Sequence, residues 1–403
     1  MKQFDVPPFY RSPLISAIKK KRKEQDKMKK DFSPTLLDFG PVQVLLARHF
    51  GFCYGVENAI DIAFRTVEEN PGKRIFLLSE MIHNPQVNAD LVAHGIRFLQ
   101  DTHAHQLIPF DSISGDDIVL IPAFGTTLEI ESLLRQKGIP TEKYNTTCPF
   151  VEKVWNRSEV IAKKEYTIII HGKPTHEETR ATFSHAAAGA PAVVVKDMAE
   201  ALRLAAYIKG EKNQDDFTRE FNGQYTAGFE VSKDLQQIGV VNQTTMLASD
   251  TQAIADYLKQ VVVSRTGKAE SFADTRDTLC YATLDNQTAV QGMLETEADL
   301  AIVVGGYNSS NTSHLVELCE EKLPTYYISH AEKIISAEEI QHYNFHTREE
   351  VISRDYLPAG KPVKMLITSG ASCPDAMVEA VINRVTSFFP GALDAGTLIA
   401  RFQ

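Results

Sequence analysis

Three of the five cysteines stand in similar surroundings, and a cysteine thiolate is a good ligand for iron or zinc. Cys53, Cys148 and Cys280 each come directly before a segment with a helical pattern, in GFCYGVENA, TTCPFVEKVWN and TLCYATLDN. A thiol at a helix N-terminus faces the positive end of the helix dipole, which favours the thiolate. No CxxC pair occurs, so ferredoxin and zinc-ribbon spacings are absent. Three unrelated buried thiols are the alternative, because free cysteine is often buried.

Three ligands from three distant turns would leave one iron of a cubane cluster without a protein ligand. An open iron of this kind can act as a Lewis acid towards a substrate oxygen. Cys319, inside a helical segment, and Cys373, beside Pro374, are expected to be structural thiols.

Polar clusters follow three of the apolar runs that predict strands. HGKPTHEET follows Ile170, GGYNSSNTSH follows Val304, and TSGASCPD follows Ile367. In open α/β sheets, ligands bind beyond the carboxyl ends of the strands, where helix N-termini attract anions. The clusters therefore predict a phosphate site, although a serine-rich surface turn would have the same composition.

Two histidines and a pair of carboxylates are candidates for binding and proton transfer. His83 lies in EMIHNPQVN and His176 in HGKPTHEET, each among turn residues after a strand-like run. A lone histidine is more often a surface or hydrogen-bonded residue. Glu177 and Glu178 stand next to each other, and a like charge with partial burial could raise the pKa of one carboxyl, as a proton donor needs. A solvated helix start is the alternative for this pair.

Short apolar runs alternate with longer amphipathic segments along the chain, which is the signature of βαβ units and parallel sheets. The fold class expected is therefore α/β. The predicted strands are 42–47, 74–78, 117–121, 166–170, 192–195, 237–241, 300–304, 325–328 and 363–367.

A chain of 403 residues is expected to form two or three domains. The cysteine turns favour three α/β domains, flanked by a polar N-terminal extension and a C-terminal tail. The expected bounds are 1–41 for the extension, 42–147 for the domain with Cys53, 148–279 for the domain with Cys148, 280–390 for the domain with Cys280, and 391–403 for the tail. Residues 209–234 are polar and rich in Gly, Asn and Asp, and predict an insertion or mobile loop in the middle domain.

Composition and charge limit the classes of partner and the cellular location that we expect for this protein. The net charge of −10 disfavours broad nucleic-acid binding. No apolar run approaches the roughly 18 residues of a membrane span. The first 40 residues lack a signal-peptide core and contain acidic residues, so we expect a cytoplasmic protein. The basic run Lys19–Lys30 predicts a solvated helix or tail, with a docking patch for an acidic electron donor as the alternative.

Together these motifs resemble the 4-hydroxy-3-methylbut-2-enyl diphosphate reductases, the IspH/LytB family, the last enzymes of the non-mevalonate isoprenoid route. The resemblance runs in family order over about residues 44–385, and PAFGTT, CPFVEKVWN and the polar insertion are more like its plant and cyanobacterial branch. The matching stretches are GFCYGVENA, EMIHNPQVN, TTCPFVEKVWN, HGKPTHEET, NQTTM, LCYAT, VVGGYNSSNTSHL and TSGASCPD.

The resemblance implies a function and a site. It implies one [4Fe–4S] cluster on Cys53, Cys148 and Cys280, three α/β domains in a trefoil around it, and a substrate hydroxyl on the fourth iron. It implies two-electron reductive dehydroxylation to isopentenyl and dimethylallyl diphosphates, with electrons from a donor such as ferredoxin or flavodoxin. Glu178 matches the proton-delivering acid and Thr244 the hydroxyl that orients the substrate oxygen. The diphosphate-binding positions are His83, His176, Ser309, Ser310, Asn311 and Ser372.

One position departs from the family pattern. Where many bacterial members have histidine in an AHG turn, this chain has Phe124, and a phenyl ring cannot donate a hydrogen bond to phosphate. Two alternatives to the reductase remain at this point. A three-cysteine hydro-lyase would consume no electrons, and an iron–sulfur redox sensor would have no need of a phosphate site.

Overall fold

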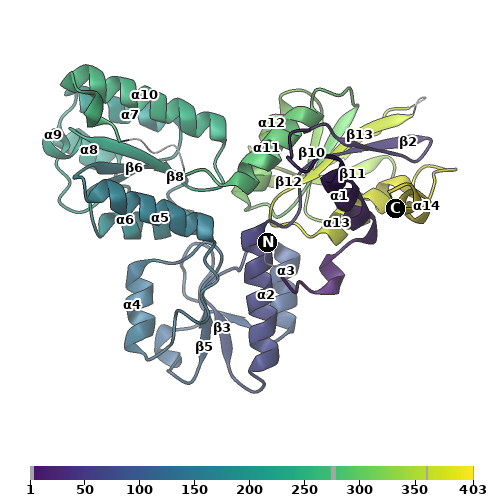
Figure 1. Ribbon diagram of the computed structural model, residues 1–403, viewed down its shortest axis with the longest axis horizontal. Coiled ribbons are helices and arrows are strands. Elements are labelled where there is room, and N and C mark those ends of the chain that lie inside the picture. The colour runs from purple at the N-terminus through teal and green to yellow at the C-terminus, as the bar shows by residue number, and fades with distance from the viewer. Residues whose placement is uncertain (1–3, 274–277, 360–361, 403) are drawn as a thin grey trace. The chain divides into compact units, whose positions relative to one another are not determined.

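The structure of the chain is a computed structural model that describes residues 4–273, 278–359 and 362–402 (Figure 1). The chain folds into two compact units. The first contains Met1–Asp61, His83–Ala89 and Tyr281–Gln403, and the second contains Ile62–Ile82 and Asp90–Cys280.

A five-stranded sheet forms the centre of the first unit. Its order is β1-β2-β13-β9-β10, in which only β1 is antiparallel to its neighbour. Every residue of β9 is buried, as expected for a parallel strand covered on both faces. The strands are β1 (Thr35–Asp38), β2 (Val42–Leu46), β9 (Leu300–Val304), β10 (Thr325–Ile328) and β13 (Val363–Ser369).

Helices cover this sheet, and a hairpin extends the unit. Leu14, Ile15 and Ile18 of α1 join the same apolar core as β2, β9 and β13. The hairpin pairs β11 (Glu339–Asn344) with β12 (Glu349–Arg354). The helices are α1 (Pro13–Gln25), α11 (Tyr281–Met293), α12 (Ser310–Glu320), α13 (Asp375–Thr386) and α14 (Ala395–Phe402), with short 3₁₀ turns at Pro8–Tyr10 and Ala331–Lys333.

Two three-stranded parallel sheets form the second unit, in the orders β4-β3-β5 and β7-β6-β8. The strands are β3 (Ile75–Leu77), β4 (Arg97–Phe98), β5 (Ile118–Leu120), β6 (Thr167–His171), β7 (Ala192–Val195) and β8 (Ile238–Asn242). The helices here are α4 (Leu128–Gln136), α5 (Pro149–Ala162), α6 (Glu177–Ala187), α7 (Met198–Lys209), α8 (Gln214–Glu220), α9 (Val231–Asp234) and α10 (Ala248–Thr266), with 3₁₀ turns at Phe110–Ser112 and Ala269–Ser271. The remaining helices are α2 (Tyr54–Glu69) and α3 (Pro85–Ala93).

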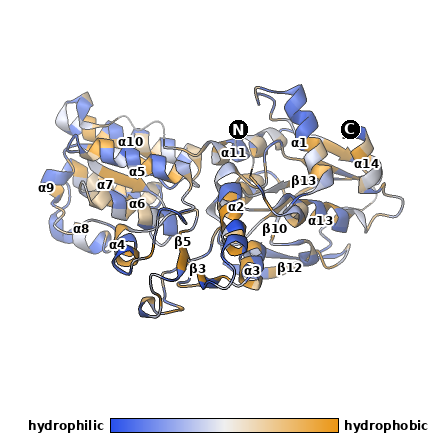
Figure 2. Ribbon diagram, turned by 60° about the horizontal axis from the view of Figure 1, so that its bottom comes forward, coloured by the Kyte–Doolittle hydropathy of each residue, from blue (hydrophilic) through white to orange (hydrophobic). Residues whose placement is uncertain are grey.

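Local sequence explains where these elements begin and end. The strands are short apolar runs, whereas helices such as α2 mix polar and apolar residues, which Figure 2 shows as blue and orange along one ribbon. Asp197 caps α7 by accepting a hydrogen bond from the Glu200 amide at 2.9 Å. Gly210 ends the same helix at a positive φ of 77°, which glycine adopts without steric penalty.

The expected fold class is confirmed. The chain is α/β with several small parallel sheets, and all nine predicted strands are present. The trefoil arrangement and the expected bounds 1–41, 42–147, 148–279, 280–390 and 391–403 stay predictions, and residues 1–3, 274–277, 360–361 and 403 of these ranges lie outside the described residues.

Other features differ from the expectations or were not anticipated. Of the two alternatives for residues 209–234, the mobile loop is wrong, because the segment contains α8 and α9 and buries the rings of Phe217 and Phe221 against Tyr207; the insertion stays a prediction. The strand β2 pairs with β13, so the first predicted strand shares a sheet with the last one.

In the described part of the chain, no helix combines the length and the apolar character that crossing a bilayer requires.

Candidate active site

Cys53 lies on a turn that is tied to the loop after β13. The Cys53 amide donates to the carbonyl of Ala371 at 3.2 Å, and the Gly51 amide donates to Ser369 Oγ at 3.1 Å. Gly51 has a positive φ of 81°, and a side chain there would collide with Asp375. Cys53 itself is partly buried and comes immediately before α2. The thiol is thus held at a helix N-terminus, as predicted.

Cys148 and Cys280 occupy corresponding positions in the second unit. Cys148 is the N-cap residue of α5, with Pro149 in the first turn, and its amide donates to the carbonyl of Ala123 at 2.9 Å. Cys280 is buried and directly precedes α11. Two residues earlier, the Thr278 hydroxyl donates to Asn242 Oδ1 at 2.7 Å, which joins this turn to the end of β8.

The five cysteines, all of them within the described residues, form no disulfide and fall into two kinds. Cys319 and Cys373 are fully buried, and burial raises the pKa of each thiol to about 12. Such groups stay protonated and suit structural thiols. Among the described residues, no three Cys, His, Asp or Glu side chains are grouped to hold a metal ion. Joint ligation by Cys53, Cys148 and Cys280 therefore stays a prediction.

Glu178 and Thr244 meet at the carboxyl end of the sheet that contains β6 and β8. These strands are parallel, with His171 opposite Asn242, so the turns that follow them start side by side. The Thr244 hydroxyl donates to Glu178 Oε2 at 2.9 Å, and the Thr244 amide donates to Oε1. Glu178 is only 1% exposed. The structure thus joins two expected catalytic residues from HGKPTHEET and NQTTM.

The neighbouring carboxylate has a different partner. Glu177 is also buried, but it accepts a hydrogen bond from the hydroxyl of Ser79. Consecutive residues at the start of α6 point in different directions around the helix, so only one of the two reaches Thr244.

Gln243 fixes the geometry of both turns and was not singled out from the sequence. Its Oε1 accepts hydrogen bonds from the Thr179 hydroxyl at 3.0 Å and from the Lys173 amide at 3.1 Å. Gly172 permits this close approach, because a Cβ there would lie 2.6 Å from Thr179 Oγ1. The only signal for Gln243 in the sequence was its place inside NQTTM.

His176 has its imidazole orientation set by the backbone. It is the N-cap residue of α6, and its Nδ1 accepts a hydrogen bond from the Glu178 amide at 3.1 Å. A neutral imidazole that accepts at Nδ1 carries its proton on Nε2, so the other edge of the ring is a donor. The Phe124 ring meets the His176 ring edge to face, with 5.5 Å between centroids. Phe124 thus packs on an expected substrate-binding residue.

In the first unit, three sequence motifs converge on one buried corner. The Ser372 hydroxyl donates to the His83 carbonyl at 3.1 Å, and the Asn84 side chain donates to the Ser372 carbonyl at 2.9 Å. Asn311 Oδ1 accepts a hydrogen bond from the Ala371 amide at 2.9 Å. The structure thereby joins EMIHNP, GGYNSSNTS and TSGASCPD. Asn84 was not singled out from the sequence, although it follows His83 in the same motif.

This corner contains buried polar atoms that suit an anion. Ser309 caps α12 by accepting from the Thr312 amide at 3.3 Å, and Ser310 and Asn311 form the first turn of that helix. Within the described residues, Ser310 Oγ and Asn311 Nδ2 are buried and have no hydrogen-bond partner. Buried polar groups are normally satisfied, so these two atoms point to a ligand with acceptor oxygens.

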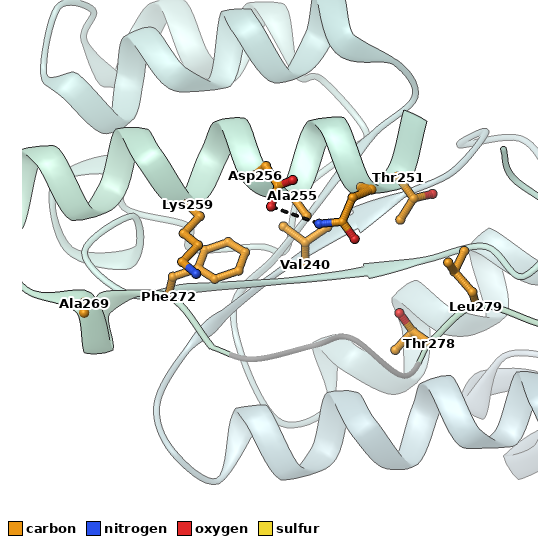
Figure 3. Close-up of a pocket in the computed structure, with 10 residues that line it drawn as sticks. Val240, Thr251, Ala255, Asp256, Lys259, Ala269, Phe272, Thr278 and Leu279 are labelled. Carbon is orange, nitrogen blue, oxygen red and sulfur yellow. Dashed lines mark hydrogen bonds between the residues drawn. The ribbon is translucent and has the colours of Figure 1, made fainter. Parts of the chain in front are cut away.

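A separate pocket of about 340 Å³ lies beside the turn that leads to Cys280 (Figure 3). Lys259 and Asp256 of α10 line it, together with Phe272, Thr278 and Leu279. None of the expected catalytic or substrate-binding residues lines this pocket. The candidate chemistry is therefore assigned to the turns described above.

The expected site residues fall into two groups. Those in the first unit are Cys53, His83, Ser309, Ser310, Asn311 and Ser372; those in the second are Cys148, His176, Glu178, Thr244 and Cys280.

Parallel sheets with polar turns at their carboxyl ends define an α/β protein of the kind that binds its ligand beyond the strand ends. The model of the family described as LytB protein matches residues 44–386, and the chain belongs to this family.

Curated relatives support this membership over nearly the full chain. A protein from Gloeobacter violaceus is 38% identical over 381 residues, covering 91% of this chain and 90% of its own. One from a Synechococcus strain is 39% identical over 353 residues, covering 87% and 86%. Both are named 4-hydroxy-3-methylbut-2-enyl diphosphate reductase. The chain is accordingly an oxidoreductase.

Solved structures share the fold. The E-1-hydroxy-2-methyl-but-2-enyl-4-diphosphate reductase from Plasmodium falciparum matches with a TM-score of 0.62 and 21% identity, covering 86% of this chain and 89% of that one. A structure of (E)-4-hydroxy-3-methyl-but-2-enyl diphosphate reductase matches with a TM-score of 0.50 and 24% identity, covering 85% and 99%. At these identities the likeness concerns the fold.

Proposed function

We propose that this protein reduces 4-hydroxy-3-methylbut-2-enyl diphosphate to isopentenyl and dimethylallyl diphosphates in the non-mevalonate route to isoprenoids. Family membership across about nine-tenths of the chain and of its relatives carries the proposal. The reaction takes up two electrons and two protons, breaks the allylic C–O bond and releases one water. The protein must therefore hold a redox group, bind a diphosphate and deliver protons.

We infer one [4Fe–4S] cluster as the redox group. Cys53, Cys148 and Cys280 would hold it, because each is a thiol at the start of a helix, where the thiolate is favoured. A bound cluster supplies electrons and an iron that can act as a Lewis acid towards the substrate hydroxyl. Cys319 and Cys373 are left out because their burial keeps them protonated.

The buried corner at α12 is inferred to bind the diphosphate. Ser310 Oγ and Asn311 Nδ2 are buried donors without partners in the described chain, and the amides at the start of α12 add the helix dipole. Ser309, Ser372 and His83 shape this corner through the hydrogen bonds described above. His176 is inferred to add an N–H donor at Nε2.

Glu178 and Thr244 are inferred to deliver the proton. Glu178 Oε2 and Thr244 Oγ1 are 2.9 Å apart, and a hydroxyl can both accept and donate. A protonated Glu178 can therefore donate to Thr244, which can donate onward to the substrate oxygen. Burial of this pair keeps bulk water out of the proton path.

The test is anaerobic purification, followed by iron and sulfide analysis and turnover with a chemical reductant. We expect one [4Fe–4S] cluster per chain and two electrons consumed for each diphosphate product. Turnover without electron consumption would indicate a hydro-lyase instead, and substrate binding without turnover would indicate a sensor. Either result contradicts the proposal.

A further inference from the structure

The N-terminal extension carries a basic helix that is anchored on the first unit. Ser12 caps α1 by accepting from the Ile15 amide at 2.9 Å, and α1 packs against α13 and α14 (Figure 1). Leu14, Ile15 and Ile18 are buried in the core of the unit. Lys20 and Lys23 therefore lie on a helix whose apolar face is buried, and Lys27 and Lys30 follow in the segment after its end.

Only part of this positive charge is neutralised within the chain. Lys19 pairs with Asp375 at 2.7 Å, Lys29 with Asp285 at 3.4 Å and Arg22 with Asp31 at 3.1 Å. A second group of four lysines is exposed and makes no ion pair within the described residues. We call it the basic face, and it consists of Lys20, Lys23, Lys27 and Lys30. This excess of positive charge belongs to a chain whose net charge is −10.

The extension also touches both neighbours of the first expected cluster ligand. The Phe4 ring contacts Tyr54 with 4.9 Å between centroids, and Tyr10 contacts Phe52 with 5.7 Å. Phe52 and Tyr54 flank Cys53. The Lys19 ammonium lies 4.6 Å from the centroid of Phe50, on the same turn.

The other end of the basic run reaches the residue that follows a second expected ligand. The Lys29 ammonium lies 5.7 Å from the ring centroid of Tyr281, which comes directly after Cys280. Tyr281 is 39% exposed. The basic run therefore contacts Phe50, on the turn of Cys53, at one end and Tyr281, the residue next to Cys280, at the other.

We propose that the basic face is the docking surface for an acidic, one-electron carrier protein that reduces the enzyme. This inference rests on the proposed function. An exposed group of lysines that make no ion pair, and that outnumber the one exposed carboxylate among them, Glu24, steers an acidic partner and speeds its association. Contacts to residues beside two cluster ligands would bring the carrier close to the redox group. Each encounter passes one electron from the reduced carrier to the enzyme, so two encounters supply the two electrons of a turnover.

The test is charge reversal in the full-length holoenzyme. The triple variant K20E/K23E/K27E reverses three of the four charges of the basic face, whereas K164E/K209E/K233E changes the net charge equally at exposed lysines of the second unit that make no ion pair in the described chain. Turnover is measured with a reduced [2Fe–2S] ferredoxin and, separately, with reduced methyl viologen. A small reductant needs no protein docking surface.

With ferredoxin, we expect K20E/K23E/K27E to lower kcat/KM for the carrier by about 10-fold or more at low salt, and the loss to shrink as ionic strength rises. The same variant should match wild type with methyl viologen, and K164E/K209E/K233E should match it with both donors. An equal loss of kcat/KM for ferredoxin in the two triple variants would contradict the proposal that the basic face is the docking surface. So would wild-type turnover that runs on viologen but not on ferredoxin. Failure of the proposed function is distinct, because the wild-type enzyme would then be inactive with viologen too.

Discussion

The ring of Tyr307 stacks on the ring of Tyr343, with 4.4 Å between the centroids and 9° between the planes. Tyr307 belongs to the GGYNSSNTS turn, and Tyr343 belongs to β11 of the hairpin. The Tyr307 hydroxyl also donates to Glu350 of β12 at 2.8 Å, and burial raises the pKa of Tyr307, so this hydroxyl stays protonated. The hairpin thus holds the turn that leads into the expected diphosphate-binding helix.

Tyr343→Ala should therefore weaken substrate binding without changing the chemical step. A lost aromatic pair is worth about 0.5–1.5 kcal/mol beyond its buried area, so KM should rise about 3- to 10-fold while kcat stays near wild type. Tyr343→Phe keeps the ring and is the matched control. Steady-state kinetics with both variants measure the effect. A lower Tm with an unchanged KM in Tyr343→Ala would show that the stack only stabilises the fold.

Glu178→Gln should bind substrate but turn over about 100-fold more slowly, the usual range for removing a general acid. Glutamine keeps the shape and its carbonyl oxygen can still accept from Thr244, but its amide is too weak an acid to release a proton at a useful rate. Glu177→Gln is the matched control and should change turnover much less, because Glu177 bonds to Ser79 instead. Turnover of both is compared anaerobically at equal iron content. If the losses are reversed, the proton donor is Glu177.

Cys53→Ser, Cys148→Ser and Cys280→Ser should each lose the cluster and the activity, because a hydroxyl is a poor replacement for a thiolate on iron. Cys319→Ser and Cys373→Ser should retain both. Placing a hydroxyl at these buried positions should destabilise the fold by about 1–3 kcal/mol. Iron and sulfide content after anaerobic reconstitution, with melting curves, separates the two groups. A fully loaded Cys148→Ser protein would exclude Cys148 as a ligand.

Asn311→Ala should weaken the substrate and inorganic diphosphate alike. A hydrogen bond to a charged group contributes about 1.5–3 kcal/mol, which corresponds to about 10- to 150-fold in binding. The structural reason is that Asn311 Nδ2 is buried without a partner in the described chain. Asn311→Asp tests whether the ligand at this position is an anion, since a carboxylate there should repel the diphosphate and weaken its binding. Inhibition constants for diphosphate that match wild type would place the anion elsewhere.

Phe124→His should leave an active enzyme. The edge contact with His176 is worth about 0.5–1.5 kcal/mol, and a new N–H donor to phosphate contributes about 1.5–3 kcal/mol, so KM should stay near wild type or fall. Phe124→Leu removes the aromatic ring without adding a donor and serves as the control. Loss of all activity in Phe124→His with the cluster intact would show that the pocket depends on the phenyl ring.

Much of this protein was predictable from local sequence alone. The nine strands were found because each is a short apolar run between turn residues. A parallel strand that is buried on both faces has such a run, because every one of its side chains lies in the core. The cysteine turns were found for a similar reason, since Pro149 and the helical pattern after each cysteine are local signals. The strands β1, β4, β11 and β12 were not expected, because they are short or exposed and lack an apolar run.

Only the tertiary structure decided which of these turns meet. The pairing of Glu178 with Thr244 depends on β6 and β8 being neighbours in register, and the contact of Ser372 with His83 joins residues far apart in the chain. Such contacts leave no local pattern, because they arise from strand order and burial and not from the spacing of nearby residues. The same holds for the extension. Its composition indicated a charged segment, but only packing of Leu14, Ile15 and Ile18 into the core decided that Lys19 lies beside the turn of Cys53.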